Sequence, residues 1–242
     1  MVNNIISFNN VKKKIGNNTI LDDVSFSVCK GDIYAYLGPN GAGKTTSIKL
    51  MLGLLKPDTG EVKLFDKNPD FNSRKKVGFC FDDDGLYTDM TYMENLIFYK
   101  KIYNTDLDLS YYINIAKLTG HEEKKVATFS RGMKKRLGII RALICNPELL
   151  ILDEPFIGLD PEGQEDFKEF LLEISKNCTI FVSSHDLYNM GSLCNRFSIL
   201  YKKILYTGEM SDINNKGTSL HEFYVSFMNS YKKDAIIRKI ER

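Results

Sequence analysis

A glycine-rich segment limits the folds open to this 242-residue chain more than any other part of its sequence. Residues 38–45 fit the pattern G-x-x-x-x-G-K-[ST], a short apolar run at 33–37 precedes them, and a segment from Thr45 to Leu55 is expected to be helical. Glycines let backbone N–H groups turn inward around a phosphate, and the following helix offers its positive N-terminus to the anion. A chance match in a glycine-containing turn is the alternative, which the strand and helix on either side disfavour.

The segment assigns a phosphate-binding role to almost every residue in it. Lys44 is expected to reach the β- and γ-phosphates of a nucleoside triphosphate, and the Thr45 hydroxyl is expected to bind Mg²⁺. The expected nucleotide-contacting residues are Gly38, Pro39, Asn40, Gly41, Ala42, Gly43, Lys44, Thr45 and Thr46. The sequence therefore predicts that the chain binds a nucleoside triphosphate.

Apolar patterns elsewhere predict an α/β fold. Alternation over residues 24–28 is typical of a half-buried antiparallel strand, whereas the continuous apolar runs 149–152 and 179–182 are typical of parallel strands covered on both faces. Residues 82–140 are expected to be mostly helical, with a capping box that opens a helix at Thr91. We expect a P-loop NTPase core with a mostly parallel sheet (residues 1–81 and 141–225), an N-terminal antiparallel β subdomain within it, an inserted α-helical subdomain (82–140) and a polar C-terminal tail (226–242).

Composition excludes several classes of protein. The chain has 43% hydrophobic and 26% charged residues, which excludes wholesale disorder. Lys+Arg 33 against Asp+Glu 31 gives a net charge of +2, without the basic stripe of a dedicated nucleic-acid-binding protein. No run approaches the roughly 18–20 apolar residues of a membrane span, so we expect no direct membrane insertion. The 5 cysteines suit buried thiols in a reducing compartment better than a disulfide framework.

Two carboxylates follow the apolar run at 149–152. Asp153 ends the strand, where a lone carboxylate is costly unless it meets a cation, and Mg²⁺ held at Thr45 is its natural partner. Glu154 is expected to point to the opposite face and to accept a proton from an attacking water. For these two residues taken alone, a solvated turn is the alternative. His185 also follows a core strand, where α/β sheets form nucleotide sites, although a lone histidine is more often structural.

Five segments, in order along the chain, resemble the motifs of the ATP-binding subunits of ABC transporters. They read GPNGAGKTT at 38–46, FSRGMKKRL at 129–137, LLILDEP at 149–155, GLDP at 158–161 and SHD at 184–186. The resemblance runs from about residue 4 to residue 225. It implies an ATPase that uses ATP and Mg²⁺, with Glu154, His185 and Lys44 as catalytic residues and Thr45 and Asp153 at the metal.

The resemblance also implies a second ATP-binding subunit, identical or different. Ser130 and Gly132 would then contact the γ-phosphate of ATP bound to the other subunit, in a head-to-tail pair around two ATP molecules. Ser130 is also a good N-cap for the helix after it, and a capped helix N-terminus is itself an anion site. For Asp160 two roles stay open: N-cap of a helix that starts at Pro161, or contact with the partner's nucleotide loop.

Three residues depart from the family pattern. Asp82 stands where glutamine is usual; its carboxylate can reach Mg²⁺ or a water bound to it, and an exposed acidic turn is the alternative. Ile15 stands where a tyrosine commonly stacks on adenine, and losing a stacking energy of about 1–3 kcal/mol implies weaker ATP binding and looser discrimination of the base. Arg131 replaces a frequent glycine, as in branches that export drugs and peptides.

These observations predict the ATP-hydrolysing subunit of an ABC transporter. It is expected on the cytoplasmic face of the cell membrane, held there by separate membrane-spanning permease subunits that dock around residues 82–93, and the expected cargo is a drug, peptide or bacteriocin-like substrate for export. The alternative is a soluble ABC-type ATPase that acts on the ribosome or on nucleic acid. The sequence has no second cassette, heptad arm or basic stripe to favour that alternative. A small-molecule P-loop kinase would need neither the Ser130 segment nor His185.

Overall fold

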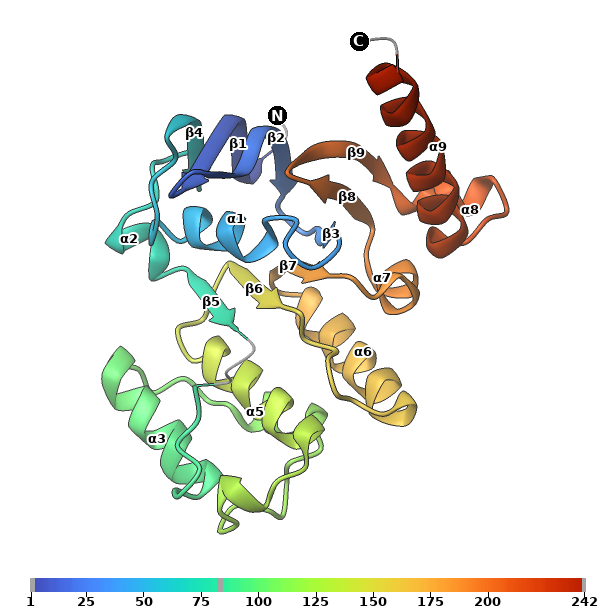
Figure 1. Ribbon diagram of the computed structural model, residues 1–242. Coiled ribbons are helices and arrows are strands. Elements are labelled where there is room, and N and C mark those ends of the chain that lie inside the picture. Colours follow the sequence, from blue (N-terminus) through green and yellow to red (C-terminus); the bar gives the residue numbers. More distant parts are fainter. Residues whose placement is uncertain (1–2, 82–84, 241–242) are drawn as a thin grey trace.

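Two β-sheets form the framework of the fold (Figure 1). The computed structural model describes residues 3–81 and 85–240, with the backbone alone for 232–240. Sheet A is antiparallel, in the order β2-β1-β4, with β1 (Asn4–Ile15), β2 (Asn18–Cys29) and β4 (Thr59–Leu64). Sheet B has the order β5-β6-β7-β3-β8-β9, with β5 (Val77–Cys80), β6 (Leu149–Asp153), β7 (Thr179–Ser184), β3 (Ile33–Leu37), β8 (Arg196–Tyr201) and β9 (Lys203–Glu209). Its strands pair in parallel except β8 with β9, which confirms the predicted mostly parallel core beside an antiparallel sheet.

Helices cover both faces of sheet B. The helix α1 (Lys44–Met51) lies between the two sheets, and α5 (Arg131–Leu143), α6 (Pro161–Ser175) and α7 (Leu187–Leu193) pack on the opposite face (Figure 1). The remaining helices are α2 (Phe71–Arg74), α3 (Tyr92–Tyr103), α4 (Ser110–Ile115), a 3₁₀ helix (Val126–Thr128), α8 (Met210–Asn215) and α9 (Leu220–Ile240). None of the helices in the described part of the chain, α9 included, has the length and hydropathy to cross a bilayer.

Strand β3 shows why the central strands read as continuous apolar runs. Tyr34 and Tyr36 belong to the core shared with sheet A and α1, whereas Ile33, Ala35 and Leu37 belong to the core shared with α5, α6 and α7. Because both faces are covered by apolar side chains, each position in the strand must be apolar or have a partner. Burial raises the pKa of Tyr34 to about 12, and its hydroxyl pairs with that of Ser198 at 2.6 Å.

Helix starts follow the predicted capping residues. Thr91 and Glu94 form a capping box at α3, and the Ser130 hydroxyl accepts from the backbone N–H of Met133 at α5. Helix α1 is shorter than predicted. It ends at Met51 because Leu52 caps it and the chain then turns through Gly53 with a positive φ of 63°.

The segment expected to be a helical subdomain is only partly helical, since loops join α3, α4, the 3₁₀ helix and α5. Tyr92 and Phe129 pack into the same core as Leu150 of sheet B, so this segment shares a core with the sheet. The boundaries expected at 140 and 226 both fall inside helices, α5 and α9. The proposed division of the chain stays a prediction.

Buried thiols match the interpretation of the cysteines. All 5 are free, and Cys80, Cys178 and Cys194 are buried. Burial raises the pKa values of Cys178 and Cys194 to about 12, which keeps both thiols protonated and unreactive at neutral pH.

Candidate active site

The P-loop lines a pocket of about 260 Å³ that follows β3; we call it the cradle. Its lining consists of Ile20, Pro39, Asn40, Gly41, Ala42, Gly43, Lys44, Thr45, Thr46 and Glu154. Gly43 has a φ of 108°, and a Cβ there would lie 2.6 Å from a methyl carbon of Leu21. Only glycine fits that backbone and that space. The predicted residues 39–46 therefore converge on one pocket.

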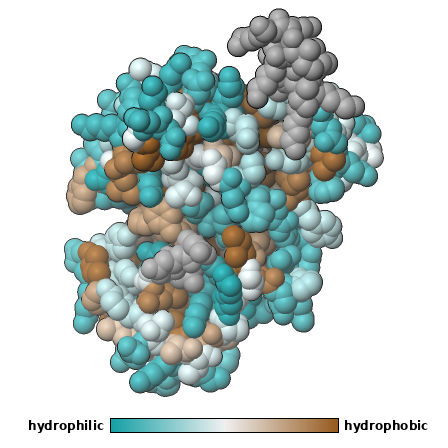
Figure 2. Space-filling view, in the orientation of Figure 1, coloured by the Kyte–Doolittle hydropathy of each residue, from teal (hydrophilic) through white to brown (hydrophobic). Residues whose placement is uncertain are grey.

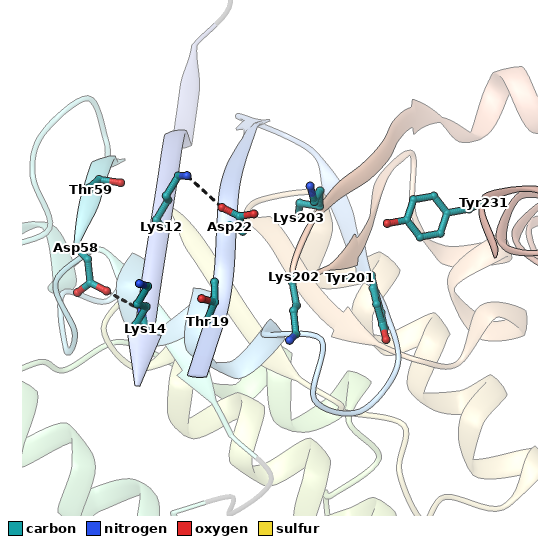
Figure 3. Close-up of a pocket in the computed structure, with 10 residues that line it drawn as sticks. All are labelled: Lys12, Lys14, Thr19, Asp22, Asp58, Thr59, Tyr201, Lys202, Lys203 and Tyr231. Atoms are coloured by element: carbon teal, nitrogen blue, oxygen red, sulfur yellow. Dashed lines mark hydrogen bonds and ion pairs between the residues drawn. The ribbon is translucent and has the colours of Figure 1, made fainter. Parts of the chain in front are cut away.

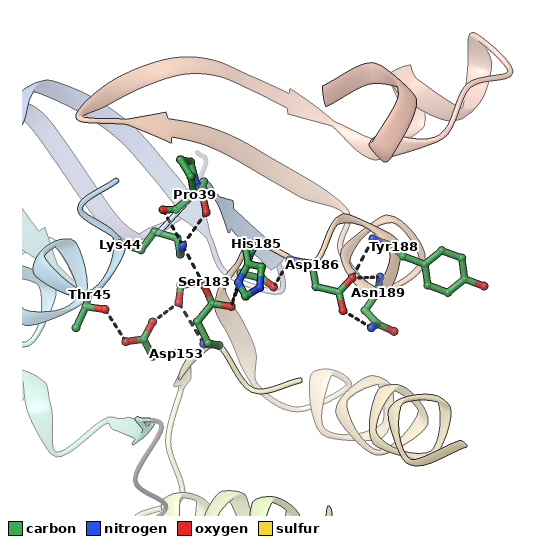
Figure 4. Close-up of polar contacts among 12 residues, drawn as sticks. Pro39, Lys44, Thr45, Asp153, Ser183, His185, Asp186, Tyr188 and Asn189 are labelled. Carbon is green, nitrogen blue, oxygen red and sulfur yellow. Dashed lines mark hydrogen bonds and ion pairs between the residues drawn. The ribbon is translucent and has the colours of Figure 1, made fainter. Parts of the chain in front are cut away.

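Lys44 is the buried cation of the cradle, with 7% of its side chain exposed. Its Nζ donates to the carbonyls of Gly38 at 2.7 Å and Pro39 at 3.2 Å, and it lies 3.0 Å from Glu154 Oε1 (Figure 4). Glu154 Oε1 makes no aligned hydrogen bond, so its contact with Lys44 is an ionic one. These oxygens hold the ammonium group at the point where a phosphate would meet it.

Glu154 lies between Lys44 and His185. Its Oε2 is 2.9 Å from His185 Nδ1 and also accepts from the backbone N–H of His185 at 3.3 Å. The Glu154 side chain is 15% exposed, whereas that of His185 is 48% exposed. The protected carboxylate therefore contacts a buried lysine on one side and a solvent-facing imidazole on the other.

Backbone geometry explains why both carboxylates contact the cradle. Strand alternation predicts that Glu154 points away from the face of Asp153, but β6 ends at Asp153 and Glu154 has a left-handed φ of 51°. A non-glycine residue rarely adopts this conformation, and such outliers concentrate at functional sites. As a result Asp153 contacts Thr45 while Glu154 contacts Lys44.

Asp153 is buried and has neutral hydrogen-bond donors. Its Oδ2 accepts from Thr45 Oγ1 at 2.9 Å, and its Oδ1 accepts from Ser183 Oγ. Ser183, which the motifs did not single out, pairs with Asp153 in the parallel register of β6 and β7. A buried carboxylate with uncharged partners is suited to a cation. Over the described residues no cluster of three or more His, Cys, Asp or Glu side chains could hold a metal, so a cation here would also need phosphate and water oxygens.

Ser130, Gly132 and Asp160 lie together at a different pocket, of about 370 Å³, that shares no lining residue with the cradle. Both oxygen-bearing side chains cap helices there. Ser130 Oγ accepts from the N–H of Met133 at 3.2 Å, and Asp160 Oδ1 accepts from the N–H of Gly163 at 3.0 Å. Within one chain, the predicted signature residues are therefore separate from the P-loop.

Ile15, predicted at the nucleotide base, does not line the cradle. Ile15 is 53% exposed at the end of β1, and Ile20 of β2 lines the cradle instead. No motif marked Ile20, since its place depends on how the β1–β2 hairpin lies over the P-loop. Asp82 lies outside the described residues, and so do its two neighbours 83 and 84.

A wider pocket of about 780 Å³ lies over sheet A (Figure 3). Its lining residues are Lys12, Lys14, Thr19, Asp22, Asp58, Thr59, Tyr201, Lys202, Lys203 and Tyr231. Lys12 pairs with Asp22 at 3.2 Å, and hydrogen bonds from the Lys13 side chain and the Lys14 backbone lower the pKa of Asp58. Its charged groups partly neutralise one another and it has no phosphate-binding motif, so the smaller cradle is the candidate active site.

Comparison with known proteins gives one consistent family. The family described as "ABC transporter" matches residues 21–157. The bacitracin transport ATP-binding protein BcrA of Bacillus licheniformis is 36% identical over 93% of this chain and 76% of its own length. The lantibiotic transport ATP-binding protein SrtF of Streptococcus pyogenes is 34% identical over 87% of this chain and 93% of its own length.

Solved structures give the same result for the fold. An ATP-binding subunit of an ABC transporter superposes with a TM-score of 0.80 at 29% identity, covering 93% of this chain and 99% of the other. An ATP-binding cassette in its ADP conformation superposes with a TM-score of 0.78 at 27% identity, covering 88% of this chain and 94% of the other.

Proposed function

The chain belongs to the ABC transporter family of ATP-binding proteins and is an ATPase subunit, and on this premise we propose which residues carry the reaction. The observation that supports the proposal most is the position of Glu154, between Lys44 in the cradle and His185 outside it. One carboxylate there can reach both a phosphate bound at Lys44 and a water that approaches from the His185 side.

Hydrolysis joins a water oxygen to the γ-phosphorus and breaks its bond to the bridging oxygen of ADP. Glu154 accepts the proton that the water gives up. The Lys44 ammonium stabilises negative charge on the γ-phosphoryl group, and the backbone N–H groups of residues 40–46 orient the phosphates. His185 holds Glu154 Oε2 through Nδ1 and orients the carboxylate toward the water.

The oxygen atoms around Asp153 fit Mg²⁺. Thr45 Oγ1 and Asp153 Oδ2 are 2.9 Å apart, and hard oxygen ligands are those that Mg²⁺ prefers. Thr45 and Asp153 would hold the ion, which supplies positive charge beside the phosphates when it is bound. The Ser183 hydroxyl orients Asp153 from the neighbouring strand.

A head-to-tail dimer is the assembly that explains the second pocket. Ser130 and Gly132 are at the start of α5, at a pocket separate from the cradle of the same chain. We propose that they contact ATP bound in the cradle of a second ATP-binding subunit, where the α5 N-terminus would favour the negative γ-phosphate.

The proposed cargo and location rest on relatives. BcrA is named for bacitracin transport and SrtF for lantibiotic transport. We propose that this chain drives export of a similar peptide-like antimicrobial through separate permease subunits, at the cytoplasmic face of the membrane.

Replacing Glu154 with glutamine tests the assigned chemistry. Glu154→Gln keeps the size of the side chain but cannot accept the proton, so kcat is expected to fall about 10²- to 10⁴-fold. The Kd for ATP should change little, because glutamine fills the same place in the lining and the P-loop backbone and Lys44 are unchanged. Steady-state ATPase assays and nucleotide titration measure the two quantities.

Glu148→Gln is the matched control, since Glu148 is a surface carboxylate paired with Lys76. It should hydrolyse ATP at the parent rate. A Glu154→Gln variant that also does so would show that Glu154 is not the base.

A further inference from the structure

A pair of amide side chains, Asn189 buried and Gln164 half-buried, joins the loop of His185 to the loop of Asp160. Asn189 of α7 is 1% exposed, and its Nδ2 donates to Asp186 Oδ2 at 2.5 Å and to Gln164 Oε1 at 3.0 Å. Gln164 of α6 then donates from Nε2 to the carbonyl of Leu159 at 3.2 Å. Figure 4 shows Asn189 beside Asp186, the residue that directly follows His185.

Chemistry fixes the orientation of both amides. A carboxylate at one end and a carbonyl at the other can only accept hydrogen bonds. Asn189 must therefore turn its NH₂ toward Asp186, and Gln164 must turn its NH₂ toward Leu159. The bond between the two amides then has one possible direction, from Asn189 Nδ2 to Gln164 Oε1. If Asn189 flipped, it would lose its bond to Asp186, and if Gln164 flipped, it would lose its bond to Leu159.

The Asp186 end is tightly held to the His185 loop. Asp186 Oδ1 accepts from the N–H groups of Tyr188 and Asn189, both at 3.1 Å, and its own N–H donates to Ser184 Oγ at 2.9 Å. Because Ser184 and Asp186 are on either side of His185, a shift of Asp186 would displace the backbone that carries the imidazole.

Packing alone does not explain why an asparagine is buried at position 189. Within the part of the chain that the structure describes, its Oδ1 is buried without a hydrogen-bond partner. An unpaired buried oxygen costs stability, and a leucine of similar size would avoid that cost. A leucine would, however, lose the two hydrogen bonds that Asn189 Nδ2 donates to Asp186 and Gln164.

We propose that Gln164 and Asn189 are positioning residues that fix His185 relative to the 158–160 loop. A displacement of Leu159, such as docking of a second subunit at Asp160 would cause, then reaches His185 through Gln164, Asn189 and Asp186. This inference rests on the proposed function for the role of His185 in hydrolysis. The link between the two loops stands on the hydrogen bonds alone.

The NMR signal of the His185 ring tests the link without any activity measurement. The chain has 3 histidines, so the ring Cε1–H signals resolve readily, and His185→Gln identifies the one in question. Asn189→Leu is expected to shift the His185 signal and to leave that of exposed His221 unchanged. Gln164→Glu keeps the acceptor for Asn189 but loses the donor to Leu159, and it should shift the His185 signal in the same direction.

Lys168→Met is the matched control. Lys168 lies one turn after Gln164 in α6 and also contacts α7, through Ser192 Oγ at 3.2 Å and the Tyr188 ring at 5.7 Å, but it bonds to neither Gln164 nor Asn189. It should leave the His185 signal in place. If Lys168→Met moves that signal as much as Asn189→Leu, general packing of α6 on α7 explains the effect and the proposal fails. It also fails if neither Asn189→Leu nor Gln164→Glu moves it.

Kinetics separate this inference from the proposed function. Asn189→Leu and Gln164→Glu should each lower kcat about 10- to 100-fold, the range expected when a reacting group is misplaced, with KM for ATP unchanged. The Gln164→Leu/Asn189→Leu double variant should be no slower than Asn189→Leu alone, since both changes break one chain of bonds. A shifted His185 signal at the parent kcat would confirm the link and contradict the role of His185 in hydrolysis. Additive losses in the double variant would contradict the link. A thermal unfolding temperature of Gln164→Glu, at a half-buried position, close to that of the parent would show that the fold persists.

Discussion

At the scale of single residues, the cradle has many groups that can bind phosphate and few that can bind the adenine or other base of a nucleotide. No aromatic side chain is among the described residues that line it, and Ile15, at the predicted base position, is an exposed aliphatic residue. The backbone N–H groups and Lys44 would bind the phosphates, which every nucleoside triphosphate carries. Affinity should therefore depend mainly on the phosphates.

Ile15→Tyr is expected to tighten ATP binding. Base–aromatic stacking contributes about 1–3 kcal/mol, and even about 1 kcal/mol lowers Kd roughly fivefold. Isothermal titration with ATP measures the change. Lys14→Tyr is the control, because neighbouring residues of a strand point to opposite faces and its ring would lie away from the base. Equal affinity gains in both variants, or no gain in Ile15→Tyr, would show that position 15 does not contact the base of ATP.

Residue types predicted that residues 39–46 form one site, and these residues do line one pocket, whereas the side-chain direction of Glu154 could not be predicted from the sequence. The P-loop pattern fixes backbone geometry locally, so residues 39–46 could be placed without knowledge of the fold. The direction of Glu154 depends on a left-handed φ of 51° just after β6, which no residue preference for glutamate indicates. The bond between Gln164 and Asn189 depends on the packing of α6 on α7, so spacing along the chain does not reveal it.

At the scale of elements, capping residues carried the most predictive power. Thr91, Ser130 and Asp160 each stand at the N-terminus that the sequence predicts, because a cap is a local hydrogen bond. Helix ends were harder. The stop of α1 at Met51 and the loops between α3 and α5 depend on tertiary packing and on turns such as Gly53.

Asp160 allows its two predicted roles to be separated. Asp160→Asn keeps a side-chain oxygen for the N–H of Gly163, so the stability should be retained, whereas Asp160→Ala loses the cap and about 1 kcal/mol. Urea unfolding measures this difference. We expect Asp160→Asn also to keep ATP-dependent dimerisation, measured by size-exclusion chromatography with light scattering in the Glu154→Gln background. Loss of the dimer at unchanged stability would instead assign the carboxylate to the subunit interface.

At the scale of the whole molecule, the segment after residue 84 forms a preformed surface on α3. Asn95, fully buried, donates to the carbonyls of Tyr87 and Thr91, both at 2.9 Å, and accepts from the N–H of Tyr87 at 2.8 Å. Tyr87 also packs edge-on against Phe98, yet it remains exposed, as does Ile97. Figure 2 shows hydrophobic residues among hydrophilic ones on the lower part of the molecule, where Figure 1 places α3. A rigid, partly apolar surface of this kind suits a protein partner.

Charge placed on this surface should prevent a permease from docking. We expect a multi-span membrane protein to co-purify with the parent chain in detergent but not with the Tyr87→Glu/Ile97→Glu double variant, because two carboxylates would be desolvated at the contact. The isolated double variant should hydrolyse ATP at the parent rate, since neither residue lines the cradle. Leu172→Glu, an equally exposed apolar position on α6, is the control and should retain the membrane protein. If the double variant co-purifies as the parent does, the permease docks elsewhere on the molecule.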